Sequence, residues 1–391
     1  MTTDLRVRIG CFAALFAGGM WLSKIAQPLY FDQSNALLAF GIGYAVMAVA
    51  GGLSFAWGAL ADRVGGLNAV RIGTLLYALG IAGRVFTDLL PVVIFSAVAG
   101  MGASLAMVGM RPWIRSHVHD DEIPRVVGVR NLGNQVGVFV GTLGAAAIFA
   151  VPAVHDGPRT GLLVAPVIVL LALACVMFGV RGKHEVRIRE TSKAPPEERH
   201  GTKGLATRLM VIGVVSGFYV SLVTPYLPLV LTAGGTSQGQ AAFTVSVMSL
   251  AQILTSWFIA RQGTSRAPFK LFFLSELGTG AATLAAALLL GLGPVAVAVL
   301  LVLRAACVAV AVVSEETIQY AVIPAHAAGF IFGLSQTAFL VGDAVGGVAG
   351  ATLWLGTGPT GLLVVAGLIT VVNAFLLPTL LRTSMIPTPV R

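Results

Sequence analysis

The chain has 391 residues, of which 57% are hydrophobic and only 10% are charged, and its mean hydropathy is +0.90. Since a soluble globular protein has about 25% charged residues, this composition excludes a water-soluble domain and predicts an all-α integral membrane protein in a lipid bilayer. The formal charge of +9 does not indicate a nucleic-acid partner, because the basic residues lie in short loops between apolar runs.

Twelve apolar runs follow one another along the chain, each close to the roughly 20 residues that an α-helix needs to cross the hydrocarbon core. They are continuous rather than alternating, which favours helices over strands. The first run is too long for a secretory signal and no small-residue cleavage site follows it, so we expect it to be retained. The predicted spans are 9–30, 37–60, 69–88, 91–113, 124–151, 160–180, 206–231, 240–260, 269–291, 294–322, 327–355 and 360–381.

The basic residues predict the orientation of these spans. With both termini in the cytoplasm, most Lys and Arg residues fall in cytoplasmic loops and only Arg159 falls in an external loop. The polar stretch at 181–203 is typical of a solvated linker. We therefore expect an N-terminal six-helix bundle at 1–182, a cytoplasmic linker at 183–204 and a C-terminal six-helix bundle at 205–391.

The first predicted span carries a lysine at membrane depth. Lys24 shares one helical face with Trp21 and Gln27, which lie three residues to either side. An ionisable residue inside a span costs about 2.5–3.5 kcal/mol on insertion scales, and a functional role is one explanation of that cost. A lysine whose long stem reaches toward the outer surface explains Lys24 equally well.

The stretch GALADRVGG follows the second span and contains an acid–base pair in a glycine-bounded turn. It resembles the loop signature G-x-L-x-D-R-x-G of the major facilitator superfamily. The positions that match are Gly58, Leu60, Asp62, Arg63 and Gly65, whereas Gly66 and Leu67 replace the usual basic pair and Arg71 is the next basic residue. The resemblance implies two pseudo-symmetric six-helix bundles, a cavity lined by spans 1, 4, 7 and 10, and transport by alternating access.

The resemblance also implies that this loop belongs to an inner gate. A carboxylate near the N-terminal end of a helix gains about 0.3–1 kcal/mol from the helix dipole. Contacts made in only one conformation shift the equilibrium toward it. We expect Asp62 to form such a latch with the start of span 11, near 327–330. The alternative is a solvated turn whose charge serves only to keep this loop in the cytoplasm.

Spans 5 and 11 contain the best internal repeat in the chain. Small residues four apart form a flat face on which another helix can pack closely. For each glycine, the alternative to static packing is a role in the conformational change of transport. A gapless alignment pairs Gly128, Gly137 and Gly141 with Gly333, Gly342 and Gly346. The span-5 spacing also resembles that of drug–proton antiporters, which favours export. Thr142 and Ser96 stand where those antiporters carry a proline and a span-4 arginine, and this departure argues against their ordinary proton antiport.

Further polar residues lie in predicted spans. Arg130 and Asn131 belong to a polar band in span 5, and Tyr219 and Tyr226 are aromatic residues of span 7 beside two prolines that permit bending or a static kink. By the resemblance, Tyr219 and Tyr226 are candidate contacts of the substrate cavity, as are Trp21, Lys24 and Gln27 of span 1. The density of the polar band makes Arg130 and Asn131 candidates as well.

Arg304 lies roughly 15 Å into span 10, too deep for its side chain to reach water easily. It is therefore a candidate cavity residue or a member of a buried pair. Asp343 in span 11 is the deepest acid and the proton-coupling candidate, with neutralisation of a nearby arginine as the alternative. Glu276 and Glu315 lie nearer the predicted cytoplasmic ends, where gating or solvation explains them.

The sequence offers little for enzymatic or metal chemistry. The cluster RSHVHDDE at 115–122 has ligand-type side chains but no second cluster, and no catalytic or phosphate-binding motif is present. We expect no enzyme activity, no cofactor and no metal site. The predicted function is proton-coupled export (efflux by an antiporter) of a hydrophobic or amphipathic small molecule. The alternative is uptake or exchange of a small anionic metabolite. The resemblance implies a monomer, and the expected location is a bacterial cytoplasmic (inner) membrane.

Overall fold

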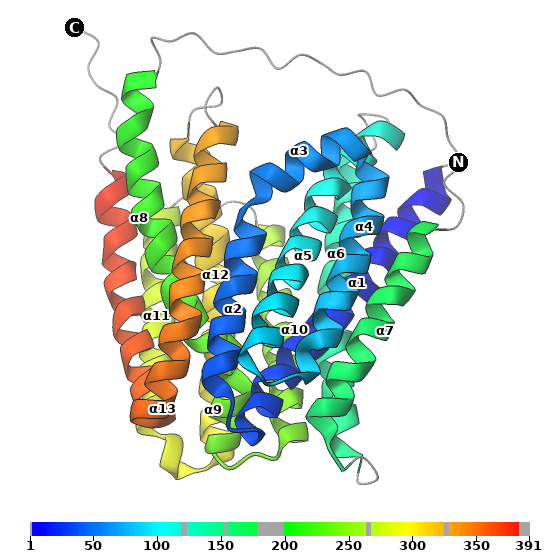
Figure 1. The fold of residues 1–391 in the computed structure, drawn as a ribbon. Coiled ribbons are helices and arrows are strands. Elements are labelled where there is room, and N and C mark those ends of the chain that lie inside the picture. Colours follow the sequence, from blue (N-terminus) through cyan, green and yellow to red (C-terminus); the bar gives the residue numbers. More distant parts are fainter. Residues whose placement is uncertain are drawn as a thin grey trace, which may run out of the picture. The chain divides into compact units, whose positions relative to one another are not determined.

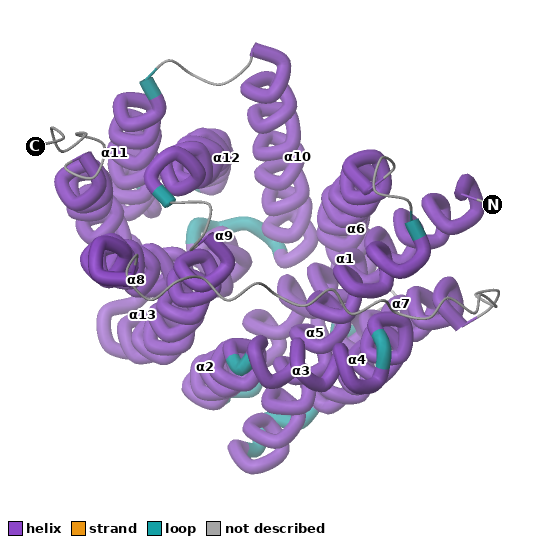
Figure 2. Tube along the Cα trace, turned by 90° about the horizontal axis from the view of Figure 1, so that it is seen from above, coloured by secondary structure: helices purple, strands orange, loops and turns teal. Residues whose placement is uncertain are grey.

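The computed structural model describes residues 2–118, 123–151, 155–177, 199–262, 267–323 and 328–382. Every regular element in these ranges is a helix, as Figures 1 and 2 show. A helix satisfies its backbone polar groups internally, as a segment that crosses lipid must. The prediction of an all-α membrane protein is confirmed.

Ten helices of the described ranges are long and apolar enough to cross a membrane. One of them, α13 (Ala328–Arg382), consists of two helices joined at Gly358, whose φ of 68° and ψ of −170° interrupt the helix. In addition, α2 (Leu37–Gly52) is a shorter apolar helix. Counting α13 as two helices and including α2 gives the twelve segments that the sequence predicts.

The second predicted span is not a single helix. The chain leaves α2 at Leu53 and continues as α3 (Ser54–Val64), which Figure 1 shows at an angle to α2. The glycine pair that ends α2 lowers helix propensity at this point. The acid–base pair expected in a turn therefore lies in the last turn of α3, and the turn itself is made at Gly65, which has a φ of 85°.

The first compact unit comprises Met1–Arg189 and Thr236–Ser246. Within it, α1 packs along α6 and α7, α4 packs against α5 and α7, and α2 packs against α5. Besides α2 and α3, its elements are α1 (Thr2–Gln33), α4 (Gly66–Ala82), η1 (Gly83–Val85), α5 (Leu89–His117), α6 (Ile123–Ala150) and α7 (Gly157–Met177).

The second unit comprises Glu190–Gly235 and Val247–Arg391. Its α8 packs along α13, and α11 packs against both α12 and α13. Besides α13, its elements are α8 (Arg199–Val223), η3 (Thr224–Tyr226), α9 (Leu227–Ala233), most of α10 (Gln238–Gln262), α11 (Pro268–Leu288), η4 (Leu290–Leu292) and α12 (Pro294–Val322).

These units differ in detail from the predicted domains. Residues 236–246, expected in the C-terminal bundle, group with the first unit. Most of the predicted linker lies outside the described residues, and α8 begins at Arg199, inside the range predicted as linker.

Four of the six repeat glycines lie where two helices approach closely. A Cβ added at Gly137 and Gly141 of α6 would meet the carbonyl oxygens of Ala14 and Gly18 on α1, and one added at Gly342 and Gly346 of α13 would meet those of Val214 and Phe218 on α8. In both units the two carbonyls are four residues apart, so the repeat makes the same backbone contact twice. At Gly128 and Gly333 no described atom lies within 4 Å of an added Cβ, so these two glycines do not take part in this helix–helix contact.

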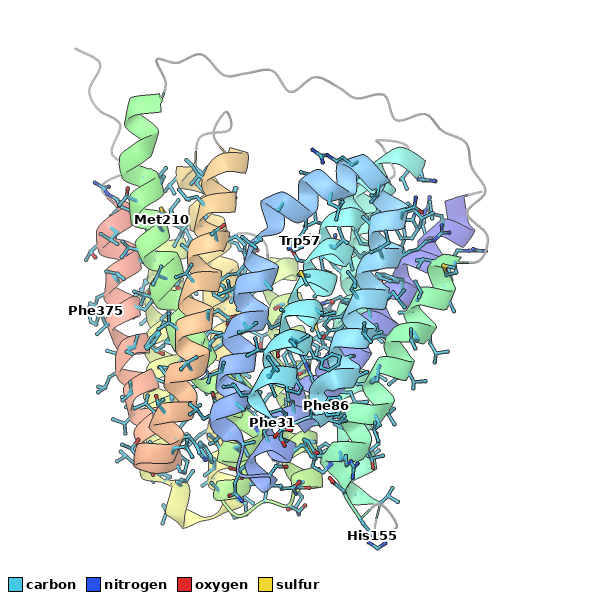
Figure 3. All side chains as sticks on the ribbon, viewed as in Figure 1. Phe31, Trp57, Phe86, His155, Met210 and Phe375 are labelled. Carbon is cyan, nitrogen blue, oxygen red and sulfur yellow. The ribbon has the colours of Figure 1, made fainter. Side chains whose placement is uncertain are left out.

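The outer helix faces keep large apolar side chains exposed. Phe375 on α13 is 53% exposed and Phe86 after η1 is 48% exposed. Figure 3 shows Phe375 pointing away from the body of its unit. Such exposure suits a helix face that contacts lipid tails rather than water.

Candidate functional site

A buried carboxyl group lies at the centre of a polar cluster in the second unit. Glu276 on α11 is only 2% exposed. Its Oε1 accepts a hydrogen bond of 2.5 Å from the Tyr219 hydroxyl on α8 and one of 3.3 Å from Asn373 Nδ2 on α13. Among the described residues, its Oε2 has no hydrogen-bond partner, and neither does the Oδ1 of Asn373. Donors from two helices, α8 and α13, thus reach one oxygen of an acid on a third helix, α11.

The spacing of residues on α11 places this acid on a polar stripe. Glu276, Thr279 and Thr283 recur at helical intervals and therefore share one face. The hydroxyls of Thr279 and Thr283 donate to carbonyl oxygens one turn earlier in α11. Gly280, beside them, lets α13 approach closely, since an added Cβ would lie 2.7 Å from a Val371 methyl.

Arg304 of α12 completes the cluster. It is 5% exposed, and its Nε donates to the Thr283 hydroxyl oxygen at 3.1 Å. Its guanidinium also interacts electrostatically with Glu276 and Tyr219. Among the described contacts, however, neither Glu276 oxygen accepts a hydrogen bond from it. The deep arginine predicted from the sequence is thus engaged inside the second unit.

The sequence places Glu276 near the cytoplasmic end of its span and explains it by gating or solvation. Its near-complete burial argues against solvation, and the gating role stays a prediction. The polar stripe on α11 is the signal that identifies it, because a buried polar face needs partners from neighbouring helices. The sequence gives no comparable indication for Asn373, because a single amide in an apolar run does not reveal which neighbouring helix its side chain faces.

The predicted proton-coupling residue, Asp343, lies elsewhere in the second unit. Its carboxylate accepts a hydrogen bond from the Ser221 hydroxyl across the α8–α13 contact. It is partly exposed, unlike Glu276. The acid that lies deepest by sequence, Asp343, is thus not the most buried acid among the described side chains, which is Glu276.

Tyr226, predicted as a cavity contact, is buried in the second unit. Its hydroxyl donates to the Gly347 carbonyl at 2.6 Å, and its ring stacks on Trp354 with centroids 6.5 Å apart. It follows the end of α8 within the short η3 segment, where Pro225 occupies the helical start position. The chain therefore breaks where the prolines predict a bend.

In the first unit, Trp21 and Lys24 lie on the same face of α1, as the sequence predicts. The Lys24 ammonium lies 5.1 Å from the centroid of the Trp21 ring, within cation–π range. Gln27 is buried, at 6% exposed. On α6, Arg130 donates to the side-chain oxygen of Asn131 at 3.1 Å, and Asn131 is exposed.

A second buried arginine lies in the first unit. Arg84 is 4% exposed and donates to the Ser23 hydroxyl at 2.7 Å and to the Met47 sulfur at 3.0 Å. Its Nε has no hydrogen-bond partner among the described residues. Asp88, four residues later, is exposed directly before α5.

The residues of the gate motif occupy different environments. Arg71 donates from Nε and Nη2 to the Val176 carbonyl at 3.2 and 3.0 Å, so it caps the C-terminal end of α7. Arg63 is exposed, and Gly58 lies in α3 with a Val108 methyl 3.7 Å from an added Cβ. The side chain of Asp62 and the predicted latch partners at 327–330 lie outside the described side chains, so the latch stays a prediction.

No group of three or more potential metal ligands occurs in the described part of the chain. The cluster at 115–122 falls largely outside that part, since 119–122 are among the residues not described. His117, within it, contacts the Trp113 carbonyl through Nδ1 at 3.0 Å.

A family model described as Major Facilitator Superfamily matches residues 9–347. A search of curated protein sequences finds no significant match.

Solved structures match over nearly their whole length. A D-xylose-proton symporter is 14% identical, with 95% of this chain and 96% of that chain covered and a TM-score of 0.73. A bacterial homologue of the human lysosomal transporter Spinster, inward-facing and occupied, is 13% identical over 99% and 98%, with a TM-score of 0.72. The nucleoside transporter NupG is 12% identical over 97% and 99%, with a TM-score of 0.71. Because these sequence identities are low, the similarity to the solved structures shows a shared fold only.

Proposed function

The chain belongs to the major facilitator superfamily and is a multi-pass membrane transporter rather than an enzyme, and on this premise we propose that it exports a small hydrophobic or amphipathic compound in exchange for protons. The compound crosses by alternating access of the two bundles. The proposal includes a monomer in a bacterial cytoplasmic membrane with both termini in the cytoplasm.

The observation that carries the proposal is the buried cluster around Glu276. A carboxyl group within a membrane span is costly and is retained where it serves transport or proton movement. Arg304 is engaged inside the same cluster, where its Nε donates to Thr283 and its guanidinium interacts with Glu276. Its charge is therefore less available to a substrate. Aromatic and apolar contacts, such as Trp21 on α1, remain for a hydrophobic compound.

Two further points support coupled export. One of the solved structures that share this fold is a D-xylose-proton symporter, so the fold is compatible with proton coupling. The glycine spacing at Gly128, Gly137 and Gly141 resembles that of drug–proton antiporters, although Thr142 replaces the proline of their motif and Ala145 and Ala146 replace its final glycine pair.

One observation favours the second candidate, uptake or exchange of a small anion. Arg84 is buried with its Nε unpartnered among the described residues. A buried guanidinium gains strongly from a bidentate carboxylate or phosphate. An anionic substrate that reaches Arg84 or Lys24 would provide that partner.

Transport into inside-out membrane vesicles tests the two candidates. An acid interior drives an antiporter to accumulate its substrate, so a fluorescent lipophilic cation should accumulate and leave when a protonophore is added. Two outcomes would overturn proton-coupled export: accumulation that the protonophore does not change, or no accumulation of any hydrophobic probe.

Ligand-induced thermal stabilisation of the purified protein separates the substrate classes. Because a ligand stabilises the folded state by RT ln(1 + [L]/Kd), lipophilic cations, neutral drugs, organic anions and sugars can be ranked. Stabilisation by hydrophobic compounds that survives Lys24→Ala and Arg84→Gln supports the exporter. Stabilisation by anions alone, lost in these variants but kept in the matched Arg159→Gln control, supports the second candidate.

A further inference from the structure

The hydrogen bonds around Glu276 are asymmetric. Both donors, the Tyr219 hydroxyl and Asn373 Nδ2, reach the same oxygen, Oε1. No donor of the described residues reaches Oε2. An ionised carboxylate has two equivalent acceptor oxygens and needs donors at both when buried, whereas a carboxylic acid has one carbonyl acceptor and one O–H donor. The arrangement fits the acid form, with Oε1 as the carbonyl oxygen.

The side chain of Asn373 supplies the acceptor that such an acid needs. Its Nδ2 already donates to Oε1, and its Oδ1 is buried without a described partner. A proton on Oε2 would donate to that Oδ1 and close a reciprocal acid–amide pair. One added proton therefore satisfies two buried acceptors that are otherwise orphaned.

We propose that Glu276 is the proton-binding group of the second unit, with the proton on Oε2 shared toward Oδ1 of Asn373. The step is a proton transfer alone. The Oε2–H bond breaks heterolytically, the proton passes to water on one side of the membrane, and the carboxylate keeps the electron pair. This inference deepens the proposed function and rests on its proton coupling.

Charged and titratable groups from every helix around Glu276 respond to the transfer. Tyr219 faces it from α8, while Arg304 and Glu315 interact with it from α12. Asn373 on α13 is polar but does not titrate. After release, the carboxylate attracts the Arg304 guanidinium and repels the Asn373 oxygen and Glu315. The deprotonated cluster therefore favours a different arrangement of α11, α12 and α13.

Tyr219 is a positioning residue that links this change to α8. Its hydroxyl bonds to Glu276 from the same helix that ends at Val223, directly before the η3 break. A change in the bond between Tyr219 and the acid therefore acts one turn from the point where α8 can bend. The proton state of α11 is thereby connected to a helix that the family uses to line the cavity.

Infrared difference spectroscopy of the purified full-length protein tests the protonation directly. We expect a carboxylic-acid carbonyl band that shifts in D₂O, disappears in Glu276→Gln and persists in the matched control Glu316→Gln, whose acid is exposed on α12. Asn373→Leu should keep the band and move its frequency, because the acid loses its amide partner. A wild-type spectrum identical to that of Glu276→Gln at every pH would overturn the proposal. The Asn373 variant provides a second test if Glu276→Gln does not fold.

Transport assays then test coupling. Glu276→Gln should lower proton-driven accumulation by about tenfold or more, because a fixed neutral side chain cannot release a proton, whereas the exposed control Glu316→Gln should retain it. If the wild type shows no proton-driven transport, the proposed function fails, and the infrared band still decides the proton site. If the wild type is proton-driven and Glu276→Gln remains so, the inference alone fails.

Discussion

Two buried tyrosines of the second unit make hydrogen bonds of nearly equal length to different acceptors. Tyr219 donates to the Glu276 carboxyl at 2.5 Å, and Tyr226 donates to the Gly347 backbone carbonyl at 2.6 Å. A neutral acceptor gives such a bond about 0.5–1.5 kcal/mol of net stability, and a charged one about 1.5–3 kcal/mol. The two tyrosines therefore allow the strength of a hydrogen bond to the Glu276 carboxyl to be compared with that of one to a neutral backbone carbonyl in the same protein.

We expect Tyr219→Phe and Tyr226→Phe to lower the free energy of unfolding by similar amounts, about 1 kcal/mol each, because a protonated Glu276 is a neutral acceptor. Denaturation of the two purified variants in the same detergent measures the difference. A markedly larger loss for Tyr219→Phe would mean that the acid is ionised in the resting protein.

At the scale of elements, two helix pairs are built alike. The α1–α6 contact in the first unit and the α8–α13 contact in the second each use two glycines four residues apart to bring backbones together. Because helices in lipid gain no hydrophobic driving force from association, such close van der Waals packing supplies much of their attraction. The internal repeat thus preserves a packing surface.

Adding a methyl group to these surfaces should distinguish packed glycines from open ones. Gly141→Ala and Gly346→Ala should each destabilise the protein by about 1–3 kcal/mol, as overpacking does elsewhere. Gly128→Ala and Gly333→Ala, where the space is open, should be neutral or stabilising by up to about 1 kcal/mol. Melting temperatures of the four variants give the answer, and equal effects at all four positions would contradict the packing role.

For the whole molecule, the sequence predicts a latch that links its two units on the cytoplasmic side. Asp62→Asn should weaken that latch and shift engineered cysteines toward cytoplasmic accessibility, because only contacts made in one state bias the equilibrium. Accessibility to maleimide reagents measures the shift. Arg159→Gln, which removes an exposed charge in the first turn of α7, is the control and should leave accessibility unchanged. Unchanged transport and accessibility in Asp62→Asn would reject the latch.

Topology is a second property of the whole molecule. In a background without Cys11, Cys175 and Cys307, a cysteine at His155, before α7, should react with an impermeant maleimide from outside the cell. A cysteine at Arg63, in the last turn of α3, should react only after the membrane is opened, because basic loops stay in the cytoplasm. The reverse labelling pattern would invert the predicted orientation.

Composition and hydropathy by themselves determined that the chain spans a membrane and where its apolar segments lie, because these are local properties of each apolar run. Direct alignment of the sequence identified the repeat between spans 5 and 11. Tertiary structure alone decided which polar groups meet. Glu276 bonds to Tyr219 and Asn373, which are 57 and 97 residues away along the chain, whereas Asp343, the deepest acid by position, meets Ser221 instead. The physical reason is that burial and partnership depend on how each helix is rotated and which helices lie beside it. Hydropathy gives the depth of a residue in its span, but it does not specify that rotation.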